Sequence, residues 1–114
     1  RLLGSVQGRP VVLLTTTGRK TGRLHTVPLG AVEDGDNYAV VASNGGRDRH
    51  PAWFLNIVSD PGARIEVGDR TIDVSAILTQ GSESNRLGLQ FPWLKRYKER
   101  TERQIPVILL KSVT

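Results

Sequence analysis

The stretch PVVLLTTTGRKTGRLHTVPLG, residues 10–30, decides the fold class of this chain. Its first part, PVVLLTTTG (10–18), is an apolar and β-branched run that ends in glycine, which predicts a largely buried strand. The GRKTG segment (18–22) predicts a tight turn, because its glycines tolerate positive φ. The apolar residues that follow predict a second strand. Pro28 has no backbone N–H, so we expect this strand at a sheet edge or where the sheet opens.

The next elements are a hairpin and a helix. The residues DGDN (34–37) are a hairpin signal, and YAVVAS (38–43) predicts the strand after it. HPAWFLNIVSDPG (50–62) predicts a helix with Pro51 at its first position and an apolar face. That predicted face consists of Trp53, Phe54, Ile57 and Val58.

The second half of the chain predicts three more elements. ARIEVGDRTIDVSAIL (63–78) alternates on either side of a Gly-Asp pair, which predicts a second hairpin. Ser82 is expected to cap a helical segment that Pro92 interrupts. IPVILL (105–110) predicts the closing strand.

The predicted order is three strands, a helix, two strands, a helical segment and a last strand, which defines an antiparallel α+β protein. Alternating βαβ units are absent, so a Rossmann fold has little support. A small barrel would let six strands avoid exposed edges. We expect one domain over residues 10–114, and we expect residues 1–9 to be the N-terminal segment of a longer chain, because the sequence contains no Met.

Composition points to an anionic partner. The net charge is +5 over 114 residues, with cations concentrated in 19–23, at 47–49 and in KRYKERTER (95–103). For the last run, a solvated helix face is the alternative to anion capture. The absence of Cys excludes disulfides and thiolate chemistry and suggests a cytoplasmic protein. No apolar run approaches the roughly 20 residues of a spanning helix.

The GRKTG turn combines an Arg fork, a Lys point charge and a Thr hydroxyl, which together suit a phosphate or carboxylate. It is not a Walker motif, because Arg19 replaces the glycine before Lys20 and a strand follows. The alternative is a solvated basic hairpin tip. ASNGG (42–46) is similarly open between turn chemistry and close backbone approach to a flat ring.

Other chemistry finds little support. Trp53 and Asn56 are neighbours on the predicted helix, where Trp53 is either core or a ligand contact. His25 and His50 do not offer a metal-ligand set, so we expect no metal. No nucleophile with an adjacent base is recognisable, which argues against hydrolysis.

Taken together, LLTTTGRKTGR, VPL, VVASNGGRDRHPAWFLNI and TERQIPVILL resemble the deazaflavin (F420)-dependent nitroreductase family, also called F420H2-dependent quinone reductases. The resemblance covers nearly everything from Arg9 onward. It implies a split β-barrel like those of FMN-binding and pyridoxine-phosphate-oxidase proteins, with about six mostly antiparallel strands, flanking helices and coenzyme F420 as the cofactor.

The resemblance also implies the cofactor site. The turn would grip the phosphodiester and glutamates of the F420 tail, while a strand, the segment after the next strand and the predicted helix would line the deazaflavin ring. The implied cofactor-binding residues are Arg19, Lys20, Thr21, His25, Thr26, Val27, Pro28, Leu29, Gly30, Val41, Ala42, Ser43, Asn44, Ala52, Trp53 and Asn56.

The implied reaction is hydride transfer from the reduced deazaflavin to a quinone, nitroaromatic or enone. Ser43 and Tyr97 are the expected hydrogen-bond donors to the charge that develops. The resemblance also implies two departures from the family pattern. His25 stands in place of an Arg of close relatives, and Phe91 and Leu94 stand in place of tyrosines that face the substrate. Phe91, Trp93 and Leu94 would then offer the substrate an apolar surface.

Three alternatives remain open: a non-catalytic deazaflavin carrier, an FMN or haem protein on the same barrel, and a basic nucleic-acid binder. The last has little support, because no reading motif is present and the chain has only six aromatic residues, so we expect no nucleic-acid partner. A quinone acceptor would make peripheral membrane contact useful, and the N-terminal segment is where we expect it.

Overall fold

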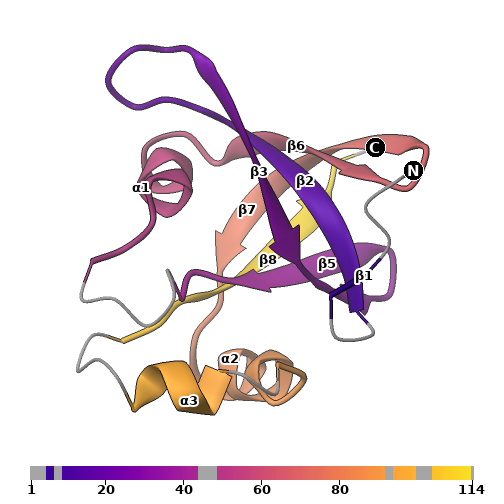
Figure 1. Cartoon of the computed structure of the whole chain (residues 1–114), viewed down its shortest axis with the longest axis vertical. Helices are drawn as coiled ribbons and strands as arrows, with labels where there is room; N and C mark the ends of the chain where they lie inside the picture. The colour runs from indigo at the N-terminus through magenta and orange to yellow at the C-terminus, as the bar shows by residue number, and fades with distance from the viewer. Residues whose placement is uncertain (1–4, 7–8, 44–48, 92–93, 100–103, 114) are drawn as a thin grey trace.

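The computed structural model describes residues 5–6, 9–43, 49–91, 94–99 and 104–113, and about half of them belong to one curled antiparallel sheet (Figure 1). The strands are β1 (Ser5–Val6), β2 (Arg9–Thr17), β3 (Leu24–Gly30), β4 (Val32–Asp34), β5 (Asn37–Val41), β6 (Gly62–Val67), β7 (Arg70–Leu78) and β8 (Val107–Ser112). The helices are α1 (Ala52–Ser59), α2 (Gly81–Gly88) and α3 (Leu94–Lys98).

The sheet follows the order β1-β2-β6-β7-β8-β5-β4, and β3 pairs with β2. Strands β3 and β4 are separated only by Ala31, which is fully buried. Apart from the two-residue β1, the edge strands of the sheet are therefore β3 and β4. The sheet curls so that these two strands follow one another in the chain and do not pair side by side. Counting β3 and β4 as one bent strand and leaving aside the two-residue β1, six strands surround the interior. The expected antiparallel split barrel is confirmed.

The β2–β3 hairpin carries the GRKTG turn away from the barrel, above α1 (Figure 1). Its strands pair continuously from Val11 opposite Gly30 to Thr17 opposite Leu24. Pro28 lies opposite Leu13, and within the described residues β3 pairs with no strand except β2. The expectation that Pro28 lies at an edge is thus confirmed, because the other side of β3 needs no backbone donor.

Two cores explain the long apolar runs of the sequence. Alternate residues of each strand face opposite sides of a sheet, so a strand that is buried on both faces is apolar throughout. In β5 and β8, Val40 and Ile108 belong to the barrel interior, together with Trp53 and Phe54 of α1. The barrel core comprises Val12, Leu14, Ala31, Tyr38, Val40, Ala42, Trp53, Phe54, Ile57, Ile65, Val74, Ala76, Ile108 and Leu110.

The second core lies where the intervening residues of β5 and β8, such as Ala39 and Leu109, pack with the C-terminal helices. Leu87, Phe91 and Leu94 join it, with Phe91 only 2% exposed and Leu94 3% exposed. The expectation that these two residues offer apolar surface to a substrate is therefore wrong, because the sheet face beside α2 and α3 covers them. Trp93 and Pro92 lie outside the described residues.

Several element boundaries differ from the predicted ones. Pro51 is the N-cap of α1 and not its first residue. Val58 is 56% exposed, so it does not share the buried face, which includes Asn56 instead. Gln80 with its extended backbone precedes α2, so Ser82 lies inside the helix and does not cap it. The last strand begins two residues later than predicted, at Val107.

An ion pair joins α2 to the β4–β5 hairpin. Arg86 donates from Nη1 to Oδ1 of Asp34 at 3.1 Å and from Nη2 to Oδ2 at 3.3 Å. The hydrogen bond to the Asp34 carboxylate, and secondarily its charge, raises the pKa of Arg86 above its usual value. Since Arg86 is exposed and Asp34 is only partly buried, the pair contributes little to stability.

Candidate active site

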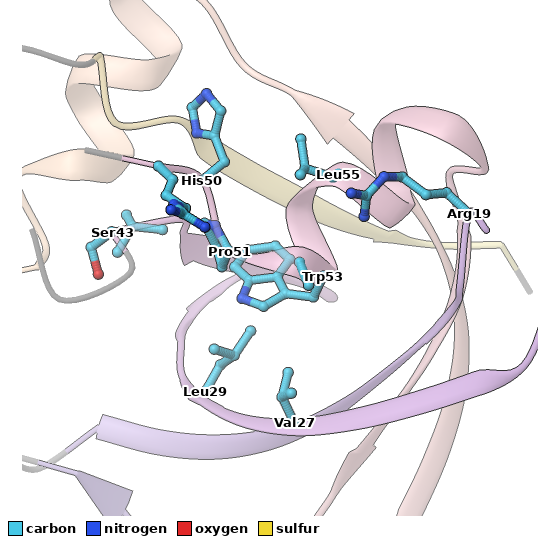
Figure 2. A pocket seen from close by; sticks show the side chains of 11 residues that line it. Arg19, Val27, Leu29, Ser43, His50, Pro51, Trp53 and Leu55 are labelled. Atoms are coloured by element: carbon cyan, nitrogen blue, oxygen red, sulfur yellow. The ribbon is translucent and has the colours of Figure 1, made fainter. Parts of the chain in front are cut away.

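A cavity of about 860 Å³ lies between the β2–β3 hairpin, α1 and the segment that precedes α1 (Figure 2). Three separate parts of the chain form it: the turn with β3, the end of β5, and residues 49–55. Its lining residues are Arg19, Val27, Leu29, Val41, Ser43, Arg49, His50, Pro51, Ala52, Trp53 and Leu55.

One side of the cavity is apolar. Val27 and Leu29 alternate on β3, so their side chains point to the same face, and Figure 2 shows both of them below the indole of Trp53. Trp53 is 7% exposed, and its ring meets Phe54 edge-on with centroids 6.4 Å apart. Trp53 therefore belongs both to the barrel core and to the cavity wall. Such a wall suits one face of a flat ring.

The cavity is polar at its margins. Arg19 reaches it from the turn, and Ser43 lies at the far end from Arg19 (Figure 2). Among the described residues, no carboxylate lies within ion-pair distance of Arg19. Arg49 and His50 line the cavity from the segment before α1, where the His50 ring packs on Phe54 at a centroid distance of 4.7 Å. The lining thus carries two guanidinium groups beside an apolar wall, an arrangement that attracts a flat anion.

The turn itself is closed by hydrogen bonds within residues 18–23. The N–H of Gly18 donates to the carbonyl of Arg23 at 2.7 Å, and the N–H of Gly22 donates to the carbonyl of Gly18 at 2.9 Å. Gly22 has a φ of 74°, which a residue with a side chain rarely adopts. Thr21 accepts a hydrogen bond from the N–H of Arg23 at 3.2 Å. The result is an ordered loop with Lys20 and Arg23 exposed on it.

The structure brings seven of the sequence-predicted cofactor residues to the cavity: Arg19, Val27, Leu29, Val41, Ser43, Ala52 and Trp53. Lys20, Thr21, His25 and Thr26 lie on the exposed hairpin beyond it. Four more predicted cofactor residues are described by the structure but do not line the cavity: Pro28, Gly30, Ala42 and Asn56. Asn44 and the side chain of Tyr97 lie outside the described part of the chain.

Four lining residues were missed by sequence reasoning: Arg49, His50, Pro51 and Leu55. In the sequence, the cation at position 49 is part of a charge cluster and Pro51 predicts a helix start, but neither signal indicates a cavity. Leu55 appears in sequence only as one more apolar helix residue. Their common role depends on where α1 lies relative to β3, which is a tertiary property.

Two further findings concern the described residues. None of their helices is long and apolar enough to cross a membrane. Nor do their His, Asp and Glu side chains form a cluster of three or more that could hold a metal ion.

The fold is a split barrel with an apolar and cationic cavity beside α1, and comparison with known proteins specifies the family. The model of the F420H(2)-dependent quinone reductase family matches residues 1–112. The F420H(2)-dependent quinone reductase Rv1261c of Mycobacterium tuberculosis is 36% identical over 111 residues, which cover 89% of this chain and 72% of that protein. The chain belongs to the F420H2-dependent quinone reductase family, whose cofactor is coenzyme F420.

Solved structures agree with this assignment. An F420-H2-dependent reductase, FDR-A, has a TM-score of 0.81 and 38% identity, over 90% of this chain and 95% of its own. A Listeria innocua protein that carries the name pyridoxamine 5′-phosphate oxidase has a TM-score of 0.63 at 15% identity, over 92% of this chain and 85% of its own. The second likeness concerns the fold alone, and it relates the sheet to the split barrels of that class.

Proposed function

We propose that the cavity holds the deazaflavin ring of reduced coenzyme F420 and that the protein passes its hydride to a quinone. One observation carries the proposal: a single cavity joins the apolar wall of Val27, Leu29 and Trp53 to Arg19 at the base of an exposed cationic turn. The family name specifies a quinone acceptor, whereas nitroaromatic and enone acceptors are our extension of it.

The donor set of the cavity suits this cofactor. F420 combines a flat ring with an anionic tail, and the site combines an apolar wall with Arg19 and Arg49. Beyond the cavity, Lys20 and Thr21 lie on the exposed turn, where they would hold the phosphodiester and glutamates. When bound, the reduced deazaflavin supplies a hydride from its C5 atom.

The protein's own residues would place the ring and stabilise charge. Trp53 and Leu29 would fix the plane of the ring, which sets the approach of the acceptor. Ser43, at the end of the cavity away from Arg19, would donate a hydrogen bond to the negative charge that develops (Figure 2). Tyr97 of α3 is the second proposed donor, and one of these hydroxyls or water would supply the proton.

A cytoplasmic location and peripheral membrane contact through the N-terminal segment remain predictions. A vesicle-sedimentation assay tests the membrane contact. Protein that stays in the supernatant with anionic vesicles at physiological salt contradicts it.

The test of function is a spectrophotometric assay with reduced F420 and menadione, in which the return of the oxidised deazaflavin absorbance is followed. We expect oxidation that depends on the protein, is weakened by Lys20→Ala and is unaffected by Lys111→Ala, a matched exposed lysine outside the cavity lining. Saturable F420 binding without oxidation of any acceptor would favour the carrier alternative. No binding would exclude the proposed site.

A further inference from the structure

We infer that Asn56 is a positioning residue that holds the cationic turn against α1, and that it acts on the cofactor only through that turn. This role rests on the proposed function, because the turn is what would bind the anionic tail. It differs from the contact with the cofactor that the family resemblance implies for Asn56.

Both ends of the Asn56 side chain are occupied inside the protein. Its Oδ1 accepts a hydrogen bond from the backbone N–H of Arg19 at 3.2 Å, and its Nδ2 donates to Oγ1 of Thr16 at 3.1 Å. The residue is 4% exposed and is not part of the cavity lining. Both groups of this buried amide thus have partners within the protein, which favours a structural role for the side chain.

Within the described residues, Asn56 is the residue of α1 that forms a hydrogen bond with the turn. The other hydrogen bonds of residues 18–23 close the turn on itself, between Gly18 and Arg23, Gly18 and Gly22, and Thr21 and Arg23. Thr16, which accepts the other hydrogen bond of Asn56, lies on β2 and is only 1% exposed, so the barrel holds it in place. A single amide therefore ties helix, strand and turn together.

This link relates the two halves of the cavity. Trp53 and Asn56 are three residues apart on α1, so they share a side of the helix. Trp53 forms the ring wall, while the residue whose N–H Asn56 holds, Arg19, lines the cavity at its charged end. The separation between wall and guanidinium is thus set through Asn56. Loosening it would misplace the cations and leave the wall intact.

The experiment measures two affinities by fluorescence titration. One is for F420, and the other is for the same deazaflavin carrying only its ribityl chain, here called the tail-less deazaflavin or tail-less compound. The variants are Asn56→Leu, which removes both hydrogen bonds, Thr16→Val, which removes one without touching the cavity, and Thr16→Ser, which keeps the hydroxyl. We expect Asn56→Leu to weaken F420 binding about tenfold and Thr16→Val to weaken it by a smaller factor, because a lost buried partner disturbs the group left behind. Thr16→Ser should bind like the wild type, and the tail-less compound should change less than about twofold throughout.

A double-mutant cycle separates positioning from direct contact. In an Arg19→Ala/Lys20→Ala background, Asn56→Leu should weaken F420 binding by less than about twofold further. A full additional loss in that background would mean that Asn56 contacts the cofactor itself, which overturns the inference.

The other outcomes are equally decisive. If the wild type binds F420 and both Asn56→Leu and Thr16→Val bind equally well, the turn does not depend on Asn56. Equal losses for F420 and the tail-less compound would indicate general damage to the site and also overturn it. Circular dichroism and thermal unfolding identify variants that fail to fold, and if Asn56→Leu does, Thr16→Val carries the test. A wild type that binds neither compound contradicts the proposed function and the positioning role with it.

Discussion

The ring of His25 lies against Gly18 across the base of the β2–β3 turn. A Cβ atom on Gly18 would come within 2.9 Å of Nε2 and 3.0 Å of Cδ2 of His25, closer than such atoms approach in proteins. The His25 ring packs over the turn that carries Arg19 and Lys20. A side chain at position 18 would therefore require the exposed His25 ring to move, although the backbone angle of Gly18 lies outside the left-handed region.

Replacing Gly18 with alanine should therefore displace the His25 ring and distort the turn. We expect a loss of at most about 1 kcal/mol in the free energy of unfolding, because the exposed His25 ring can move aside, together with weaker F420 binding. Thermal unfolding and F420 titration measure the two effects. The double variant Gly18→Ala/His25→Ala removes the clash, so it should regain stability; if it is no better than Gly18→Ala alone, the contact is not the cause.

Lys20→Ala should affect cofactor affinity more than turnover. Lys20 is exposed on the turn and lies outside the cavity lining, so we expect the Kd for F420 to rise about tenfold while kcat at saturating cofactor stays within about twofold. The affinity of the wild type should fall with added salt, and the variant should be less sensitive. Lys111→Ala is the matched control. An unaltered Kd for Lys20→Ala would place the tail elsewhere.

Trp53 tests the opposite end of the ligand. Trp53→Phe keeps an aromatic wall and should bind the tail-less deazaflavin within a few-fold of the wild type, whereas Trp53→Leu should weaken binding of both F420 and the tail-less compound. Since Trp53 also fills the barrel core, Trp53→Ala should cost about 3–5 kcal/mol of stability, and it is unsuitable for binding assays. Equal effects of Trp53→Leu and Lys20→Ala on the tail-less compound would contradict the division of the site.

The two proposed hydrogen-bond donors are tested by Ser43→Ala and Tyr97→Phe. Removing a donor to developing charge should lower kcat with menadione by about tenfold or more and leave the Kd for F420 nearly unchanged. Stopped-flow measurement of deazaflavin oxidation separates the chemical step from product release. A variant that turns over at the wild-type rate removes its residue from the scheme.

Phe91→Tyr tests the finding that this position belongs to the second core. A hydroxyl introduced at a residue that is 2% exposed should destabilise the protein by about 1–3 kcal/mol. Leu89→Tyr, at a neighbouring position that is 87% exposed, should stay within about 0.5 kcal/mol. If Phe91→Tyr is as stable as the wild type and changes acceptor preference, the residue faces the substrate after all.

Local patterns were sufficient to predict most of the fold. The strand, hairpin and helix order follows from apolar alternation, from turn residues such as Asp34 to Asn37, and from the Pro51 and Asp60-Pro61-Gly62 boundaries of one helix. The predictions that were wrong concern a helix cap and a buried face, which depend on contacts with the rest of the fold. Ser82 has the chemistry of a cap, but the chain enters the helix before it, and Val58 has the character of a core residue, but α1 turns it to solvent.

For the site, residue types and their spacing were enough to predict the available chemistry: a cationic turn, an apolar strand with Pro28, a Trp-bearing helix and the family motifs. These are properties of short segments, and they follow from residue type and spacing. Which of these segments share a cavity depends on how they pack in three dimensions. Arg49 and His50 line the cavity, Phe91 is buried in the second core, and Asn56 forms hydrogen bonds with Thr16 and Arg19. These contacts depend on how α1, β3 and the C-terminal helices pack around one curled sheet, which joins segments that are distant in the sequence.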